Sequence, residues 1–260
     1  MLNHPRNPRA TLWLLAYNGL TAETHLSILH EMAQWPNLVH RVKAGDANID
    51  RARSKVASWF LQDTSTVEPQ TGVTVEATGD VMLMVDADNA WCPGDLAKIA
   101  KRALEHNAVV GGIYPKRAFN QGPALRAEDD TIGDFAIGED ALFPCEFVGT
   151  GFIAIPKSIL RAVGETLPHC RGDVDKDPFP TYQPFFMPYV LHGRLGDEYP
   201  TDDHAFCARV RECGFQVLAS TYPRLTHEGM YSYRMVDSNI SPPLDRDIEI
   251  HLKGAERVAV

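Results

Sequence analysis

Three features are missing from this sequence of 260 residues: cysteine pairs at metal-binding spacing, long apolar runs and an excess of positive charge. Its five cysteines form no CxxC pair, which argues against a zinc site and is typical of thiols in a reducing compartment. The longest strongly apolar stretches, such as 81–85 and 152–155, fall far short of the roughly 20 residues that cross a bilayer, so no transmembrane segment is predicted.

The net charge of −9 repels polyanions on average and does not favour nucleic acid as a partner. A local basic groove that holds phosphate stays open as an alternative. One candidate set for such a groove is Arg41, Lys43, Arg51, Arg53 and Lys55.

The first residues are polar and basic, and the apolar run after them is short and has no small-residue cleavage site. We therefore expect a cytoplasmic protein. A length of 260 residues fits one compact domain, because single domains commonly reach about 250 residues.

The first half of the chain alternates strand and helix patterns. Residues 11–16 are apolar and predict a buried strand. Thr21 is placed to cap the following helix, in which Leu26, Leu29 and Met32 recur at helical spacing.

The alternation continues with a strand at 38–42, a helix at 50–61, a strand at 80–85, a helix opened by residues 93–95 and a strand at 108–114. Such an order predicts a single α/β domain of the Rossmann-like type, with a mostly parallel central sheet flanked by helices.

The second half is less regular. A polar segment at 118–139 and a proline-rich segment at 168–188 are predicted to be long loops, which in compact domains are usually functional. Between them, residues 147–155 predict one apolar strand, and a helix follows from Lys157. Another helix is expected from Asp202 to the residues before Gly214.

Asp86 and Asp88 stand where an apolar strand runs into a loop. Two carboxylates at this spacing suit Mg²⁺ together with a diphosphate. In open α/β sheets ligands bind outside the carboxyl ends of the strands, where Tyr17 and Asp46 should also gather. By itself the pattern does not separate a metal site from a solvated strand end or a helix cap.

Six short motifs follow one another in an order and spacing that resembles the GT-A glycosyltransferases, in particular those similar to family 2. The resemblance spans about residues 11 to 230. The motifs are Ala16-Tyr17-Asn18-Gly19, Ala52-Arg53-Ser54, Val85-Asp86-Ala87-Asp88, Gly149-Thr150-Gly151-Phe152, Asp202-Asp203-His204-Ala205-Phe206-Cys207 and Leu225-Thr226-His227-Glu228-Gly229.

The resemblance implies a GT-A catalytic domain at 11–235, with a nucleotide-binding half at about 11–115 and an acceptor-side half at about 116–235. A tail at 1–10 and a C-terminal extension at 236–260 flank it.

The resemblance also implies a metal site for Mn²⁺ or Mg²⁺. Asp86 and Asp88 form the metal and diphosphate motif around Ala87, with Asp88 as the direct ligand, and His227 completes the site. A loop histidine without a ligand role is the alternative reading of His227.

For the nucleotide, the resemblance implies that Ala16, Tyr17 and Asn18 cradle the base and ribose, and that Asp46 reads uracil. An ordinary Asn-Gly turn and a Gly-Asp turn are the structural alternatives.

Arg53 resembles the arginine that helps to neutralise the diphosphate, although Ser54 follows it where the family often has Asn. The alternative is an arginine on the solvated face of a helix. Gly151 resembles the glycine that lets the donor sugar or the acceptor approach closely, since it has no Cβ. The structural reading of Gly151 is a bulge at the start of a strand, and both readings can be true.

Asp202 and Asp203 resemble a Glu-Asp pair in which the second acid is the general base of inverting enzymes. Here the first acid is Asp, which has a shorter reach than Glu. Both could instead cap the helix that they begin. If the reaction retains the anomeric configuration, Asp203 only orients groups.

The expected activity is transfer of a sugar from a nucleoside diphosphate sugar, with a UDP-sugar favoured, to a hydroxyl acceptor. The acceptor stays open among a glycan, a protein, a small molecule and a hydroxylated DNA base, and so does the oligomeric state. A sugar nucleotidyltransferase is one alternative, but its early glycine-rich basic loop is absent after the first strand. A non-catalytic nucleotide- or carbohydrate-binding module is the other.

Overall fold

The computed structural model describes most of the chain. Asn18, most of the tail at 1–10 and most of the extension at 236–260 lie outside the described residues. The described ranges are 7–17, 19–62, 66–67, 74–75, 79–117, 122–129, 131–193, 196–229 and 249–252.

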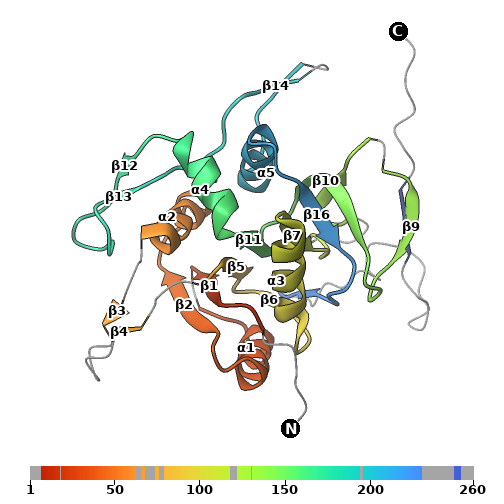
Figure 1. Ribbon diagram of the computed structural model, residues 1–260, viewed down its shortest axis with the longest axis horizontal. Coiled ribbons are helices and arrows are strands. Elements are labelled where there is room, and N and C mark those ends of the chain that lie inside the picture. The colour runs from red at the N-terminus through yellow and green to blue at the C-terminus, as the bar shows by residue number, and fades with distance from the viewer. Residues whose placement is uncertain are drawn as a thin grey trace.

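An eight-stranded sheet forms the centre of the molecule (Figure 1). All of its strands run in the same direction except β11 and β10. The spatial order is β2 (Val39–Ala44), β1 (Ala10–Ala16), β5 (Val81–Asp86), β11 (Phe152–Pro156), β7 (Val109–Gly112), β16 (Val217–Ser220), β10 (Leu142–Val148) and β8 (Leu125–Ala127). This arrangement confirms the predicted α/β fold with a mostly parallel sheet.

Helices cover both faces of the sheet, as Figure 1 shows. On one face lie α1 (Ala22–Gln34) and α3 (Asp95–His106), and on the other α2 (Ile49–Gln62), α4 (Lys157–Glu165) and α5 (Asp202–Glu212). Each face has its own apolar core, because the strands are buried on both sides and point alternate side chains to each. The six strands that share one direction have their carboxyl ends on the same side of the sheet.

In the described part of the chain, five two-stranded antiparallel sheets lie outside this central sheet. They are β6 (Asn89–Ala90) with β17 (Thr226–His227), β12 (Cys170–Arg171) with β13 (Thr181–Tyr182), β14 (Leu191–Gly193) with β15 (Gly196–Glu198), β9 (Gly133–Ala136) with β18 (Glu249–Leu252), and β3 (Thr66–Val67) with β4 (Thr74–Val75).

The prediction of one strand at 147–155 was wrong. The chain forms β10 and β11, and Gly149 and Gly151 lie in the break between them. A Cβ on Gly149 would come within 2.2 Å of the Tyr114 hydroxyl, so the chain turns here around a packed side chain. The two segments predicted to be long loops also contain short strands, β8 and β9 in 118–139, and β12 and β13 in 168–188.

Helix α1 is confirmed, and the Thr21 side chain caps it by accepting a hydrogen bond from the Thr24 amide at 3.2 Å. Its apolar residues Leu26, Leu29 and Met32 nevertheless face solvent. The described cysteines are all free. In the described part of the chain, no helix combines the length and hydropathy that a bilayer span requires.

Candidate functional site

The carboxyl ends of β1, β2 and β5 open into a cleft of about 740 Å³, within the usual size of small-molecule sites. The sheet topology explains this, because parallel strands present their ends at one edge. Seven of the residues predicted from the sequence line the cleft: Ala16, Tyr17, Asp46, Arg53, Asp86, Ala87 and Asp88.

Arg53 links two of the predicted acidic motifs. From the first turns of α2 its guanidinium donates to both carboxylate oxygens of Asp86, at 2.7 and 2.8 Å, and to Oδ2 of Asp202 on α5. Only 7% of its side chain is exposed, so the solvated-face alternative is wrong. Burial opposes the charge of Arg53, but the two carboxylates outweigh it and raise the pKa of the guanidinium.

Asp88 lies between two cationic or basic groups. Its Oδ2 is 2.9 Å from the guanidinium of Arg117, and its Oδ1 is 3.5 Å from Nε2 of His227. Burial works against ionisation of Asp88, but the ring of His227 and the charge of Arg117 hold its pKa below the ordinary value. Asp88 is therefore ionised at neutral pH.

Two very short strands bring His227 to this position. Strand β6 directly follows the Asp-Ala-Asp motif, and β17 pairs with it so that His227 lies opposite Asn89. The amide of Glu228 also donates to the carbonyl of Asp88 at 2.6 Å. Residues 140 positions apart in sequence are thus tied together by backbone bonds.

The His227 ring is oriented as in many metal ligands. Its Nδ1 lies 2.9 Å from the carbonyl oxygen of Pro115, which can only accept, so Nδ1 carries a proton and Nε2 is the nitrogen that faces Asp88. Among the described residues no group of three or more His, Cys, Asp or Glu is arranged to hold a metal. An ion between Asp88 and His227 would take its remaining ligands from substrate phosphates or water, as Mg²⁺ commonly does.

Gly151 packs directly against the acidic motif. Its carbonyl accepts from the Asp86 amide at 2.9 Å, and its own amide donates to the Tyr114 hydroxyl at 3.0 Å. A Cβ at this position would lie 2.9 Å from Oδ2 of Asp86 and 2.7 Å from Nδ2 of Asn89. A side chain at position 151 would therefore displace Asp86 or Asn89, and this holds whether or not the glycine also forms a bulge.

The two acids at the start of α5, Asp202 and Asp203, make different contacts. Asp202 contacts Arg53, as described above. Asp203 accepts at Oδ1 from the Thr201 hydroxyl and from the His204 amide, the latter at 2.9 Å. These bonds hold the carboxylate at the first turn of α5, which is compatible with capping and with catalysis.

Asp46 is 6% exposed at its side chain and is held by Arg51, whose Nη2 donates to Oδ1 at 2.7 Å. Tyr17 lines the mouth of the same cleft and is 60% exposed. Its neighbour Asn18 lies outside the described residues.

Sequence reasoning missed Arg117, which lines the cleft and contacts Asp88. One signal was available. Arg117 comes five residues after the end of β7, on the same edge of the sheet as the acidic motif.

No known family profile matches the chain, and no curated protein matches it either. Its structure is similar to that of A197 from STIV, with 15% identity and a TM-score of 0.50 over 88% of this chain and 91% of that one. It also has a weaker similarity to GalNAc-T7, solved with UDP, GalNAc and Mn²⁺, with 11% identity and a TM-score of 0.47. The match covers 89% of this chain and 45% of the GalNAc-T7 chain. At these identities the likeness is one of fold.

Proposed function

We propose that this chain is a metal-dependent glycosyltransferase that moves a sugar from a nucleoside diphosphate sugar to a hydroxyl acceptor. The observation that carries the proposal is the convergence of Asp86, Asp88, Arg53 and His227 at the carboxyl edge of the sheet. In this site a buried arginine, Arg53, bonds to two acids, and a histidine lies next to a further carboxylate. A protein that only binds a nucleotide or a sugar does not need such a set of groups.

The donor would lie in the cleft with its nucleoside toward β1 and β2. Tyr17 offers an exposed aromatic ring on which a base can stack, and Asp46 offers a fixed hydrogen-bond acceptor. The Asp46 carboxylate can accept a hydrogen bond from the imide N–H of uracil. A UDP-sugar is therefore the preferred sugar donor in this proposal.

The diphosphate would lie toward Asp88. Asp88 and His227 would hold Mn²⁺ or Mg²⁺ there, and such an ion would supply positive charge beside the departing diphosphate. Arg117 is 56% exposed at its side chain and lines the cleft, so it can turn from Asp88 to a phosphate oxygen. Arg53 keeps Asp86 and Asp202 in place throughout, because both carboxylates bond to one buried cation.

In this proposal Asp203 accepts the proton of the acceptor hydroxyl as the hydroxyl oxygen attacks the anomeric carbon. The bonds from Thr201 and His204 to a single oxygen fix the orientation of its carboxylate. Its position one residue after Asp202 puts it on the helix that contacts Arg53.

The test is release of UDP, GDP or TDP from a panel of their sugar conjugates, measured with Mn²⁺ and with EDTA. We expect release to need the metal and to fall at least about 100-fold in Asp88→Ala. Asp129→Ala is the matched control, because Asp129 is exposed and does not line the cleft. Release that is equal with EDTA, or equal in Asp88→Ala and the wild type, would contradict the proposal, as would no release from any conjugate.

A further inference from the structure

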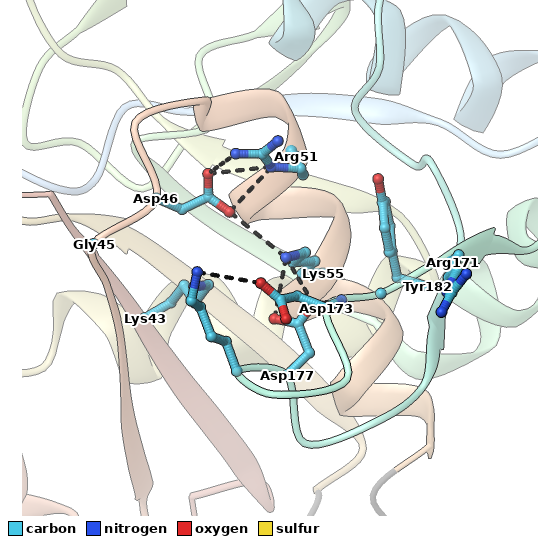
Figure 2. A pocket seen from close by; sticks show the side chains of 11 residues that line it. Lys43, Gly45, Asp46, Arg51, Lys55, Arg171, Asp173, Asp177 and Tyr182 are labelled. Atoms are coloured by element: carbon cyan, nitrogen blue, oxygen red, sulfur yellow. Dashed lines mark hydrogen bonds and ion pairs between the residues drawn. The ribbon is translucent and has the colours of Figure 1, made fainter.

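A second cavity of about 390 Å³ lies beside the cleft, between the end of β2, helix α2 and the β12–β13 hairpin. Figure 2 shows the side chains that surround it, with Asp46 and Arg51 on one side and Arg171 and Tyr182 on the other. Lys43 and Asp46 line both hollows, so the second cavity adjoins the cleft without being part of it.

The cavity is positively charged in a chain whose net charge is −9. Five cationic side chains line it against three carboxylates, an excess of two positive charges. The cations are Lys43, Arg51, Lys55, Arg171 and Lys176.

Each of the three carboxylates already has a cationic partner. Arg51 is 2.7 Å from Asp46, Lys55 is 2.7 Å from Asp177, and Lys176 is 3.3 Å from Asp173. In the described part of the chain, neither Lys43 nor Arg171 has a carboxylate within 4.0 Å. The two excess charges therefore belong to residues on different walls, one on β2 and one on β12.

Ion pairs and hydrogen bonds link the side chains on one wall of the cavity. The side chains of Lys55 and Asp177 are 9% and 2% exposed, and the amide of Asp173 donates to the Asp177 carboxylate at 2.8 Å. The Tyr182 ring packs 5.8 Å from the Lys55 ammonium. This network holds the 171–182 loop against α2, and Arg171 pairs with Thr181 at the base of that loop.

We propose that this cavity binds the phosphoryl group of a small phosphate monoester. A phosphate monoester carries about 1.5 to 2 negative charges at neutral pH, which matches the excess of positive charge. Guanidinium and ammonium groups are the side chains that bind phosphate best, and here Arg171 and Lys43 line opposite sides of the cavity. The volume also leaves room for an organic group beyond the phosphate. The proposal does not depend on the activity proposed for the cleft.

The test is isothermal titration of the metal-free protein with glycerol 3-phosphate and, separately, with inorganic phosphate. We expect glycerol 3-phosphate to bind, and Arg171→Gln to weaken it at least about tenfold while Arg171→Lys restores part of the affinity. Arg161→Gln is the matched control, since it removes one positive charge from an exposed position on nearby α4. It should bind as the wild type does.

A further variant distinguishes binding of glycerol 3-phosphate in this cavity from binding in the cleft. Arg117 lines only the cleft, so Arg117→Gln should leave the binding of glycerol 3-phosphate unchanged. Loss of binding in Arg117→Gln but not in Arg171→Gln would put the phosphate in the cleft and overturn the inference. Three other results would also overturn it. They are unchanged affinity in Arg171→Gln, binding of inorganic phosphate without binding of glycerol 3-phosphate, and no binding of either probe at millimolar concentration.

Discussion

Arg53 and Asp86 form an ion pair in which one guanidinium nitrogen contacts both carboxylate oxygens. Nη2 of Arg53 lies 2.8 Å from Oδ1 and 2.7 Å from Oδ2 of Asp86. The pair joins the end of β5 to helix α2, and the other arm of the guanidinium reaches Asp202 on α5. One buried cation thus connects three elements that are distant in sequence.

Replacing this cation should destabilise the fold strongly. Arg53→Met would leave Asp86 and Asp202 partly buried without a counter-charge, which typically costs about 3–5 kcal/mol. Urea unfolding measures the loss. Arg102→Met is the control, because Arg102 pairs with Asp140 and Glu105 at the surface, where such pairs contribute less than about 1 kcal/mol. Equal losses in the two variants would mean that Arg53 has no special structural role.

Gly151→Ala should lower the rate of UDP release strongly and the free energy of unfolding only slightly. The added Cβ would lie 2.9 Å from Oδ2 of Asp86 and from the Tyr114 hydroxyl, so Asp86 must shift. A displacement of about 1 Å at a reacting centre can cost roughly 100-fold in rate. Steady-state UDP release measures this. Gly122→Ala, where a Cβ meets nothing within 4 Å, should behave as the wild type.

His227→Ala should weaken Mn²⁺ binding by about tenfold or more, because it removes the nitrogen that faces Asp88. The dependence of UDP release on Mn²⁺ concentration gives the apparent affinity. His192→Ala is the control, since His192 is exposed and pairs with Asp197 in the β14–β15 hairpin. An unchanged Mn²⁺ dependence in His227→Ala would remove His227 from the site.

Asp95 should make the protein less stable as the pH rises. Burial, with a further contribution from the charge of Glu31, raises the pKa of Asp95 from an ordinary 3.8 to about 7. The folded state therefore holds the Asp95 proton more tightly than the unfolded state, and the stability present below about pH 4 is lost as the pH rises to about 7.

Between pH 5 and pH 8 we expect Asp95→Asn to remove a decline in unfolding free energy on the order of 3 kcal/mol. Asp129→Asn, at an exposed position, should keep the decline. Urea unfolding at the two pH values measures both variants, and parallel pH profiles for the wild type and Asp95→Asn would refute this assignment.

The sequence predicted the strand ends and helix starts well because their signals are local. The apolar run before Asp86, the Thr21 cap and the apolar face of α2 all appear where expected. The burial of Arg53 could not be predicted, because it depends on acids that are 33 and 149 positions away. Only the family resemblance brought these acids into one site.

Other features gave no usable sequence signal. Strands of two residues, such as β6 and β17, are too short for any periodicity, yet they set the distance from His227 to Asp88. In α1 the apolar spacing of Leu26, Leu29 and Met32 suggested a packing face, but Thr24, Ser27, Ile28 and Glu31 are buried instead. Tertiary partners decide this: the Ser27 hydroxyl bonds to the Trp91 carbonyl, and Glu31 accepts from the first amides of α3.

The most direct measurement is equilibrium binding of UDP by titration calorimetry, with and without Mn²⁺, for the wild type and Asp88→Ala. The proposed function predicts binding that needs the metal and that falls at least about tenfold in the variant, because Asp88 would hold the ion beside the diphosphate. UDP binding of equal strength with and without Mn²⁺, and equal in the variant, would contradict it.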